Sequence, residues 1–421
     1  MEAIIDRDIK EEYIISRYAL DNVPKKEWNA FLAKMRKRNH FNRSGKSIHE
    51  YIHSLLKEEK LNILELNNFL DKQLMFGKNR NVIICKIDTI NLTIEQMKSI
   101  IEECFQIDLS KNYYNVLATS ILKDHERDCL GLAHFQSYND DEYINKIRLI
   151  FVRKVTATRR YNDKFGNKLE EPVLTNRYFP IEIDLDNNVI IAKSLPTEYE
   201  EGKGTVIVRD YVDKIIGLFS VNINLISLEY KKILHKICNE LLEDIIREKS
   251  KYHLQELEND ISSFGKKVEE VLMSKGVNID AIKNSLPYRN KSVFDIEKQI
   301  KSSIENMVVS DILLKTSLDK DGLDGIVSYI KFSDRKEVNA VIKTSKRKQS
   351  LIDSQTYLSM RRALIDCEQV EKIRVIWYKN KEEIDLYYDA SDMNFLEIHF
   401  YTNLYKEEFN YAWNKLKECR H

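Results

Sequence analysis

The sequence lacks several signatures that would assign a protein to a functional class at once. None of its six cysteines forms a CxxC pair or another metal-ligand pair, so we expect free thiols in a reducing compartment. No uncharged apolar stretch approaches the roughly 20 residues that a membrane helix needs. The charged first residues do not resemble a secretory signal. These absences predict a cytoplasmic protein with no membrane contact.

The common nucleotide-binding and hydrolase motifs are also absent. There is no GxGxxG and no GxSxG, and Gly45-Lys46-Ser47 lacks the upstream glycine of a P-loop, because position 40 is His. The sequence therefore predicts no bound cofactor and gives no support for nucleotide hydrolysis. A serine or cysteine nucleophile assembled from distant positions stays open, because such triads leave no local pattern.

The chain carries no excess of either charge. Lys plus Arg and Asp plus Glu each number 67, so the formal net charge is zero. Global charge therefore provides no attraction to nucleic acid or to an acidic membrane, and any such attraction must come from local clusters. A near-neutral chain also repels its own copies weakly, which favours self-association or a protein partner.

What the sequence does contain is ample material for hydrophobic cores. It has 421 residues, 43% of them hydrophobic, with 22 Tyr and 16 Phe, which is typical of a globular protein of several domains. The patterning predicts the α+β class. We expect a mainly helical domain at 1–145, a mostly antiparallel β-rich domain at 146–227, a helical connector at 228–310 and a C-terminal α+β domain at 311–421.

Hydrophobic periodicity predicts the individual elements. Helices are expected within 24–76 and at 93–105, 209–219, 349–365 and 405–419. Strands are expected at 81–87, 147–155, 177–185, 189–194, 205–208, 326–332, 338–344, 372–378, 383–388 and 395–402. Pro180 lies inside one of these runs and indicates an edge strand or a bulge, because proline has no N–H to donate to a ladder.

Residues 228–273 predict a long helical stretch, with an interruption possible in its first half. Its second part keeps a 3-4-3-4-3 apolar spacing, a coiled-coil-like seam formed by Leu254, Leu257, Ile261, Phe264, Val268 and Val271. Continued backwards, the seam meets polar residues, so the earlier half must pack on another face. We interpret the seam as a helix hairpin within its own domain, with pairing between chains as the alternative.

The sharpest local motif is His49-Glu50-Tyr51-Ile52-His53. It is an HExxH pattern, whose histidines lie one helical turn apart and can share a zinc ion. By pattern it resembles the zincin metalloproteases. The resemblance covers five residues and implies zinc ligation by His49 and His53 and a general base at Glu50. The polar residues before the motif favour two histidines on a half-exposed helix, so a zinc-dependent hydrolase is kept as an alternative.

Two acid-free basic runs carry the favoured hypothesis. The first lies at 34–46, at a break between two predicted helices, and the second at 148–160, on a predicted strand. Basic side chains in such runs can contact the phosphate backbone of nucleic acid. The candidate residues are Arg36, Lys37, Arg38, Arg43, Lys46, Arg153, Lys154, Arg159 and Arg160.

The sequence thus favours a nucleic-acid-binding or complex-forming protein without catalytic activity of its own. Its sequence preference is expected to be weak, because no recognition-helix or zinc-finger pattern is present. The expected partners are the phosphate backbone of nucleic acid and a protein partner or a second copy. Membership of a prokaryotic defence-type system is a further hypothesis that no residue carries. The alternatives are the zinc hydrolase and a pure assembly subunit.

Overall fold

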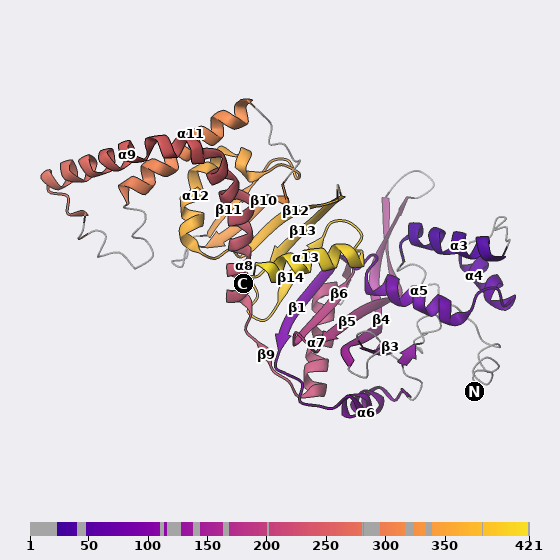
Figure 1. Cartoon of the computed structure of the whole chain (residues 1–421). Coiled ribbons are helices and arrows are strands. Elements are labelled where there is room, and N and C mark those ends of the chain that lie inside the picture. Colours follow the sequence, from indigo (N-terminus) through magenta and orange to yellow (C-terminus); the bar gives the residue numbers. More distant parts are fainter. Residues whose placement is uncertain are drawn as a thin grey trace. The chain divides into compact units, whose positions relative to one another are not determined.

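The structure is a computed structural model that describes residues 23–39, 48–109, 113–115, 128–137, 144–162, 168–199, 202–279, 281, 295–315, 323–333, 339–380 and 382–419. It has the α+β architecture expected from the sequence, with antiparallel strands and many helices (Figure 1). The chain divides into two compact units. Unit 1 comprises residues 1–226 and 394–409, and unit 2 comprises residues 227–393 and 410–421. None of the described helices is long and apolar enough to cross a membrane.

Unit 1 is built on an antiparallel sheet with the strand order β14-β1-β6-β5-β4-β3-β2. Its strands are β1 (Asn81–Ile87), β2 (Tyr113–Asn115), β3 (Asp128–Ser137), β4 (Ile144–Asn162), β5 (Lys168–Asp184), β6 (Val189–Ser194) and β14 (Leu396–Phe400). Strands β4 and β5 pair along seventeen residues of each, from Lys146–Asp184 to Asn162–Lys168. Short strands β7 (Glu198–Tyr199), β8 (Gly202–Lys203) and β9 (Ile223–Asn224) lie off this path.

Helices cover both faces of this sheet. Residues such as Phe151 and Phe179 pack on one side with α6 (Ile94–Phe105) and α7 (Gly204–Phe219). Their chain neighbours Val152 and Tyr178 pack on the other side with α3 (Lys25–Asn39), α4 (Ile48–Lys57) and α5 (Ile63–Met75). Successive side chains of a strand point to opposite faces, so a strand covered on both sides reads as a continuous apolar run.

Unit 2 begins with a long helical stretch. Helix α8 (Ser227–Cys238) passes through a π-helical turn, η1 (Asn239–Glu243), into the 31-residue α9 (Asp244–Ser274). Helix α11 (Ile296–Lys315) packs along α9, so the two form a hairpin that we call the arm (Figure 1). The expectation that the seam belongs to a hairpin is confirmed, although the seam divides into two rows that are described below.

The sheet of unit 2 is antiparallel and contains β11-β10-β12-β13 in that order. Its strands are β10 (Gly325–Ser333), β11 (Asn339–Lys343), β12 (Lys372–Lys379) and β13 (Glu382–Asp389). Between β11 and β12 lie a 3-10 turn, η3 (Leu351–Asp353), and α12 (Gln355–Cys367), and the closing helix is α13 (Lys406–Glu418). Helix α12 and η1 both contact β10, which brings α12 close to the root of the arm.

Most predicted elements are confirmed, including β1 and β6 at their predicted bounds and α6 with Thr93 as its N-cap. The strand predicted at 205–208 is wrong, because these residues open α7. A β-branched run suggested a strand, but its apolar spacing continues as that of a helix, with Ile207, Val208, Tyr211 and Ile215 buried on one face. Pro180 lies opposite Ile150 of β4 and one residue beyond the end of the β5–β6 ladder, so no residue of β6 pairs with it.

The first two domains expected from the sequence, at 1–145 and 146–227, contribute strands to the same sheet of unit 1. Unit 1 also takes up residues 394–409 from the C-terminal region. The six cysteines are free thiols, as the sequence predicted.

Candidate functional site

A groove lies in unit 2, at the root of the arm. Its volume is about 650 Å³, and three helices line it. Helix α9 contributes Arg247, Glu248, Lys251, Leu254, Gln255 and Glu258, α11 contributes Lys298, Lys301, Ser302 and Glu305, and α12 contributes Arg361, Arg362 and Ile365. The three helices come from distant parts of the chain, so the groove exists only in the folded unit.

The floor of the groove is fixed by a buried ion pair. The Nε of Arg361 donates to Oε1 and Oε2 of Glu243 at 2.8 and 2.7 Å, and its Nη2 lies 2.7 Å from Oε2. The two side chains are 2% and 0% exposed. Burial opposes the charged form of Arg361, but hydrogen bonding to Glu243 and the charges of Glu243 and Glu305 outweigh it, so the pKa of Arg361 is raised. A bidentate pair of this kind holds the guanidinium in one orientation.

The π-helical turn supplies the carboxylate of this pair. Glu243 is the last residue of η1, and it also accepts a hydrogen bond from the hydroxyl of Tyr357 at 2.7 Å. Burial and the neighbouring Glu243 carboxylate raise the pKa of Tyr357, which keeps its hydroxyl protonated as a donor. A π-turn adds one residue to a helical turn and changes the direction of the side chains that follow, and such turns are frequent at functional sites.

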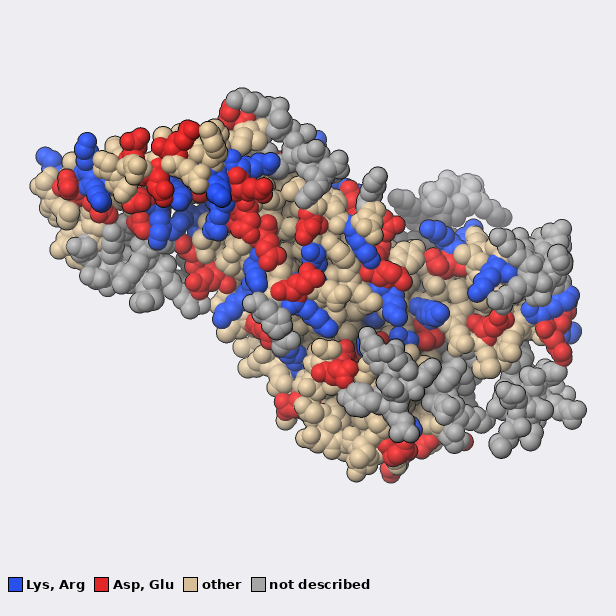
Figure 2. All heavy atoms as spheres, viewed as in Figure 1, with Lys and Arg blue, Asp and Glu red and all other residues tan. Residues whose placement is uncertain are grey.

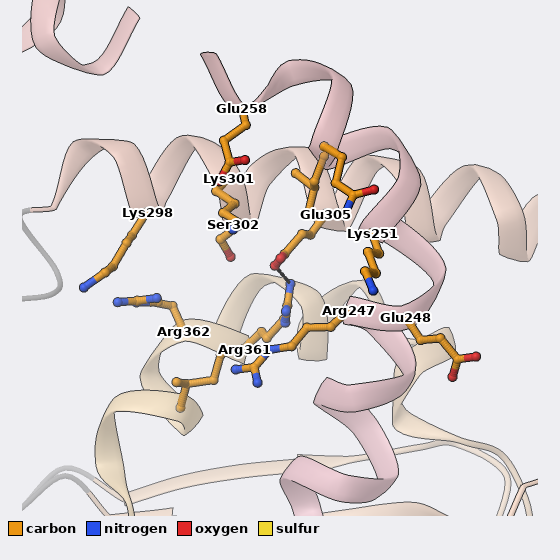
Figure 3. A pocket seen from close by; sticks show the side chains of 13 residues that line it. Arg247, Glu248, Lys251, Glu258, Lys298, Lys301, Ser302, Glu305, Arg361 and Arg362 are labelled. Atoms are coloured by element: carbon orange, nitrogen blue, oxygen red, sulfur yellow. Dashed lines mark ion pairs between the residues drawn. The ribbon is translucent and has the colours of Figure 1, made fainter. Parts of the chain in front are cut away.

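A second carboxylate joins the floor from α11. Glu305 lies 2.8 Å from Nη1 of Arg361, and the same nitrogen donates to the side-chain oxygen of Asn306 at 3.2 Å (Figure 3). Asn306 in turn donates to the carbonyl of Leu358 on α12 at 3.0 Å. Arg361 thus connects α12 to Glu243, the residue that directly precedes α9, and to Glu305 on α11.

Most of the basic side chains of the groove lie on its walls. Of thirteen lining residues six are Lys or Arg and three are Glu. Setting aside Arg361 with Glu305 leaves five basic side chains against Glu248 and Glu258. In Figure 3 the head groups of Lys298 and Arg362 point toward one another, and Arg247 reaches toward Arg361.

Three aspartates beside the groove match this excess of three basic side chains in number. Asp244, Asp295 and Asp366 lie within 3.8 Å of Arg247, Lys298 and Arg362, each from a position three or four residues away on or beside the same helix. The first two of these pairs are well exposed and therefore weak. For Lys251 and Lys301 no carboxylate partner lies within 4 Å among the described residues. These two ammonium groups are the ones most available to a bound anion.

Beyond the groove, charges of both signs alternate over the arm. On the face seen in Figure 2, Lys and Arg side chains are interspersed with Asp and Glu over α9 and α11. A mixed surface gives no long-range field of one sign. Recognition of an anion would therefore depend on the concave groove, where basic groups converge at short range.

The first basic run predicted from the sequence lies in unit 1. Arg36, Lys37 and Arg38 occupy the last turns of α3, but their side chains are not described. Arg43 and Lys46 lie outside the described residues. The role proposed for this run therefore stays a prediction.

The second basic run lies on β4, where one of its members has an acidic partner and two others have acidic residues opposite them in the strand register. Arg153 is buried, and its Nη1 lies 3.4 Å from Asp210 on α7. Lys154 is half-buried. The β4–β5 register places Arg159 opposite Glu171 and Arg160 opposite Glu170. Directly opposite residues of an antiparallel pair share a face, so an acid-free run of sequence need not form an acid-free surface.

The HExxH pattern lies on α4. Glu50 and His53 are exposed, and Tyr51, Ile52 and Leu55 are buried against α3 and α5, while the side chain of His49 is not described. Among the residues that the structure describes, no three His, Cys, Asp or Glu side chains gather as a metal centre. The helix buries one face and exposes the other, as an ordinary amphipathic helix does.

The sequence does not reveal the groove, because no run of like charges marks it. Its basic residues are scattered among acids along α9 and α11. One signal was available: Arg361 occupies a core position of α12, between Leu358 and Leu364. A charged residue on an apolar face implies a buried partner, which in the structure is Glu243.

Comparison with known proteins assigns no family to this fold. No protein-family model matches the chain, and no curated protein matches it closely enough to count as a relative.

Proposed function

We propose that this chain binds a phosphate-rich polyanion, with nucleic acid as the main candidate. The groove in unit 2 is the proposed site of contact with this ligand. The observation that supports the proposal is the groove itself: basic side chains from three helices converge on one concavity of about 650 Å³. A groove of that size holds a few phosphate and sugar groups rather than a whole duplex.

The basic side chains of the groove differ in whether they are available to a ligand. Arg361 is locked by Glu243 and Glu305, so it shapes the floor instead of binding the ligand. Lys251 on α9 and Lys301 on α11 both line the groove, and an anion bound to both would be neutralised by two ammonium groups. Contacts of this kind position a backbone and carry no sequence information, so the proposed binding is independent of base sequence.

The test is fluorescence anisotropy with labelled single- and double-stranded DNA and RNA, titrated from low to physiological salt. We expect binding that weakens steeply with salt, because neutralised phosphates release counterions. The double variant Lys251→Glu, Lys301→Glu should bind at least about tenfold more weakly, with a salt slope smaller by about two. The matched control is Lys249→Glu, Lys266→Glu, which changes two exposed α9 lysines outside the groove.

Two kinds of result would contradict binding at the groove. No binding at low salt, or equal losses in the groove and control variants, would remove the proposal. Loss only in Arg36→Glu, Arg38→Glu would move the site to the basic run on α3 that the sequence favoured.

A further inference from the structure

The arm exposes a regular row of apolar side chains. Leu257, Phe264 and Val271 on α9 recur every seven residues, and they are 37%, 57% and 59% exposed. Large apolar groups left open at heptad spacing are characteristic of a helix that packs on another helix. We call these three residues the outer row.

The other half of the seam is used inside the arm. Leu254 and Ile261 are buried, and Val268 is half-buried. Gly265, one turn from Ile261, faces α11 closely: a Cβ at Gly265 would lie 3.5 Å from the Cβ of Glu297. One row of the predicted seam is therefore buried within the hairpin. The outer row has no covering helix among the described residues.

We propose that the outer row is the docking site for a second copy of this chain, with α9 packed antiparallel on α9 about a two-fold axis beside Phe264. A heptad-spaced row fits a helix with the same spacing, and the chain itself supplies one. A two-fold axis makes the same patch serve both partners. The row runs from Leu257 to Val271, which is fourteen helical steps or about 21 Å of helix.

The charges beside the row select the antiparallel orientation. Asp260 and Lys267 are exposed, and each lies three residues after one member of the outer row and four residues before the next. With Phe264 opposite Phe264, Leu257 lies opposite Val271 of the second copy, and Asp260 lies within about one residue, or 1.5 Å along the axis, of Lys267 of the second copy. A parallel pair would instead place Asp260 beside Asp260 and Lys267 beside Lys267, which is unfavourable.

The docking site is separate from the proposed anion groove. None of the outer-row residues lines the groove, and α9 presents the two on different faces. The zero net charge of the chain also adds no global repulsion between copies. The inference therefore stands or fails independently of the proposed function.

The first experiment measures the mass of the full chain in solution by sedimentation over a range of concentrations. We expect a reversible dimer whose dissociation constant rises at least about tenfold in Phe264→Glu, because the central apolar contact of an interface dominates its energy. The control is Met307→Glu, which changes an exposed apolar residue of α11 outside the row. Ile261 is unsuitable for this purpose, because it is buried and its change would disturb the arm itself.

The second experiment fixes the orientation by disulfide trapping. Phe264→Cys should cross-link to itself on oxidation, whereas Leu257→Cys and Val271→Cys should cross-link only when mixed, with the unsubstituted chain as the background for its native thiols. Asp260→Lys and Lys267→Asp should each weaken the dimer, and the double variant should restore it. A monomer at the highest soluble concentration, a dimer unaffected by Phe264→Glu, or self-cross-linking of Leu257→Cys would overturn the proposal.

Discussion

The ammonium group of Lys193 lies 4.2 Å from the centre of the Phe76 ring and 4.9 Å from that of Phe409, inside unit 1. The side chain is fully buried. Burial lowers the pKa of Lys193 to about 8, although the nearby Glu182 carboxylate opposes part of this shift. The two aromatic rings supply further attraction to a cation that has lost its water.

This burial predicts an unusual alkaline response. In the folded chain Lys193 releases its proton near pH 8, whereas in the unfolded chain it keeps the proton to about pH 10.5. Between these values the unfolded chain binds more protons, so the contribution of Lys193 to stability rises with pH. The full change is about 3 kcal/mol. This change in stability is absent below pH 8, where Lys193 is charged in both the folded and the unfolded chain.

Urea unfolding of the wild type and of Lys193→Met from pH 7 to 10 measures this effect. Other titrating groups cancel in the difference between the two proteins. We expect that difference to move in favour of the wild type as pH rises above 8. If the difference in free energy of unfolding between the two proteins is the same at every pH, the pKa of Lys193 is not lowered by burial.

A second prediction concerns the floor of the groove. Arg361→Met should lower the free energy of unfolding by about 3–5 kcal/mol, because it leaves the Glu243 carboxylate buried without a counter-charge. The double variant Arg361→Met, Glu243→Gln should recover part of the loss, since glutamine is neutral and still accepts from Tyr357. Arg247→Met, which changes an exposed groove arginine, should alter stability by about 0.5 kcal/mol or less. Equal losses in Arg361→Met and Arg247→Met would contradict the assignment.

A third prediction uses two glycines in opposite settings. Gly77 follows α5 with a positive φ of 53°, and a Cβ there would lie 2.5 Å from the carbonyl oxygen of Gln73. Gly77→Ala should therefore destabilise the chain by about 1–3 kcal/mol. Gly217 lies within α7, and a Cβ there would meet nothing within 4 Å. Gly217→Ala should stabilise by about 0.5–1 kcal/mol. Thermal unfolding of both variants checks the opposite signs.

Much of the fold could be predicted because local patterns dictated it. The apolar run of β1 and the capping box at Thr93 and Gln96 determine their elements without help from distant residues. The strand predicted at 205–208 is wrong because a β-branched run fits both a strand and a buried helix, and only packing against the sheet decides between them.

The candidate site could not be predicted in the same way. Its geometry depends on Glu243 meeting Arg361, a pair separated by 118 residues. The basic run on β4 was also not interpretable from the sequence alone. The acidic residues opposite part of this run, Glu170 and Glu171, belong to the next strand, β5. Charge patterns read along a chain do not report which charges meet across strands or helices.

The pairing of β1 with β14 has a consequence for the order in which the chain is made. Asn81 pairs with His399, so one edge of β1 stays open until more than three hundred further residues have been added. At the usual pace of translation this takes on the order of 15–60 s. During that time the nascent unit 1 presents an incomplete sheet edge, which is open to unwanted pairing with other chains. Efficient production of the protein should therefore depend on whatever shields β1 on the ribosome.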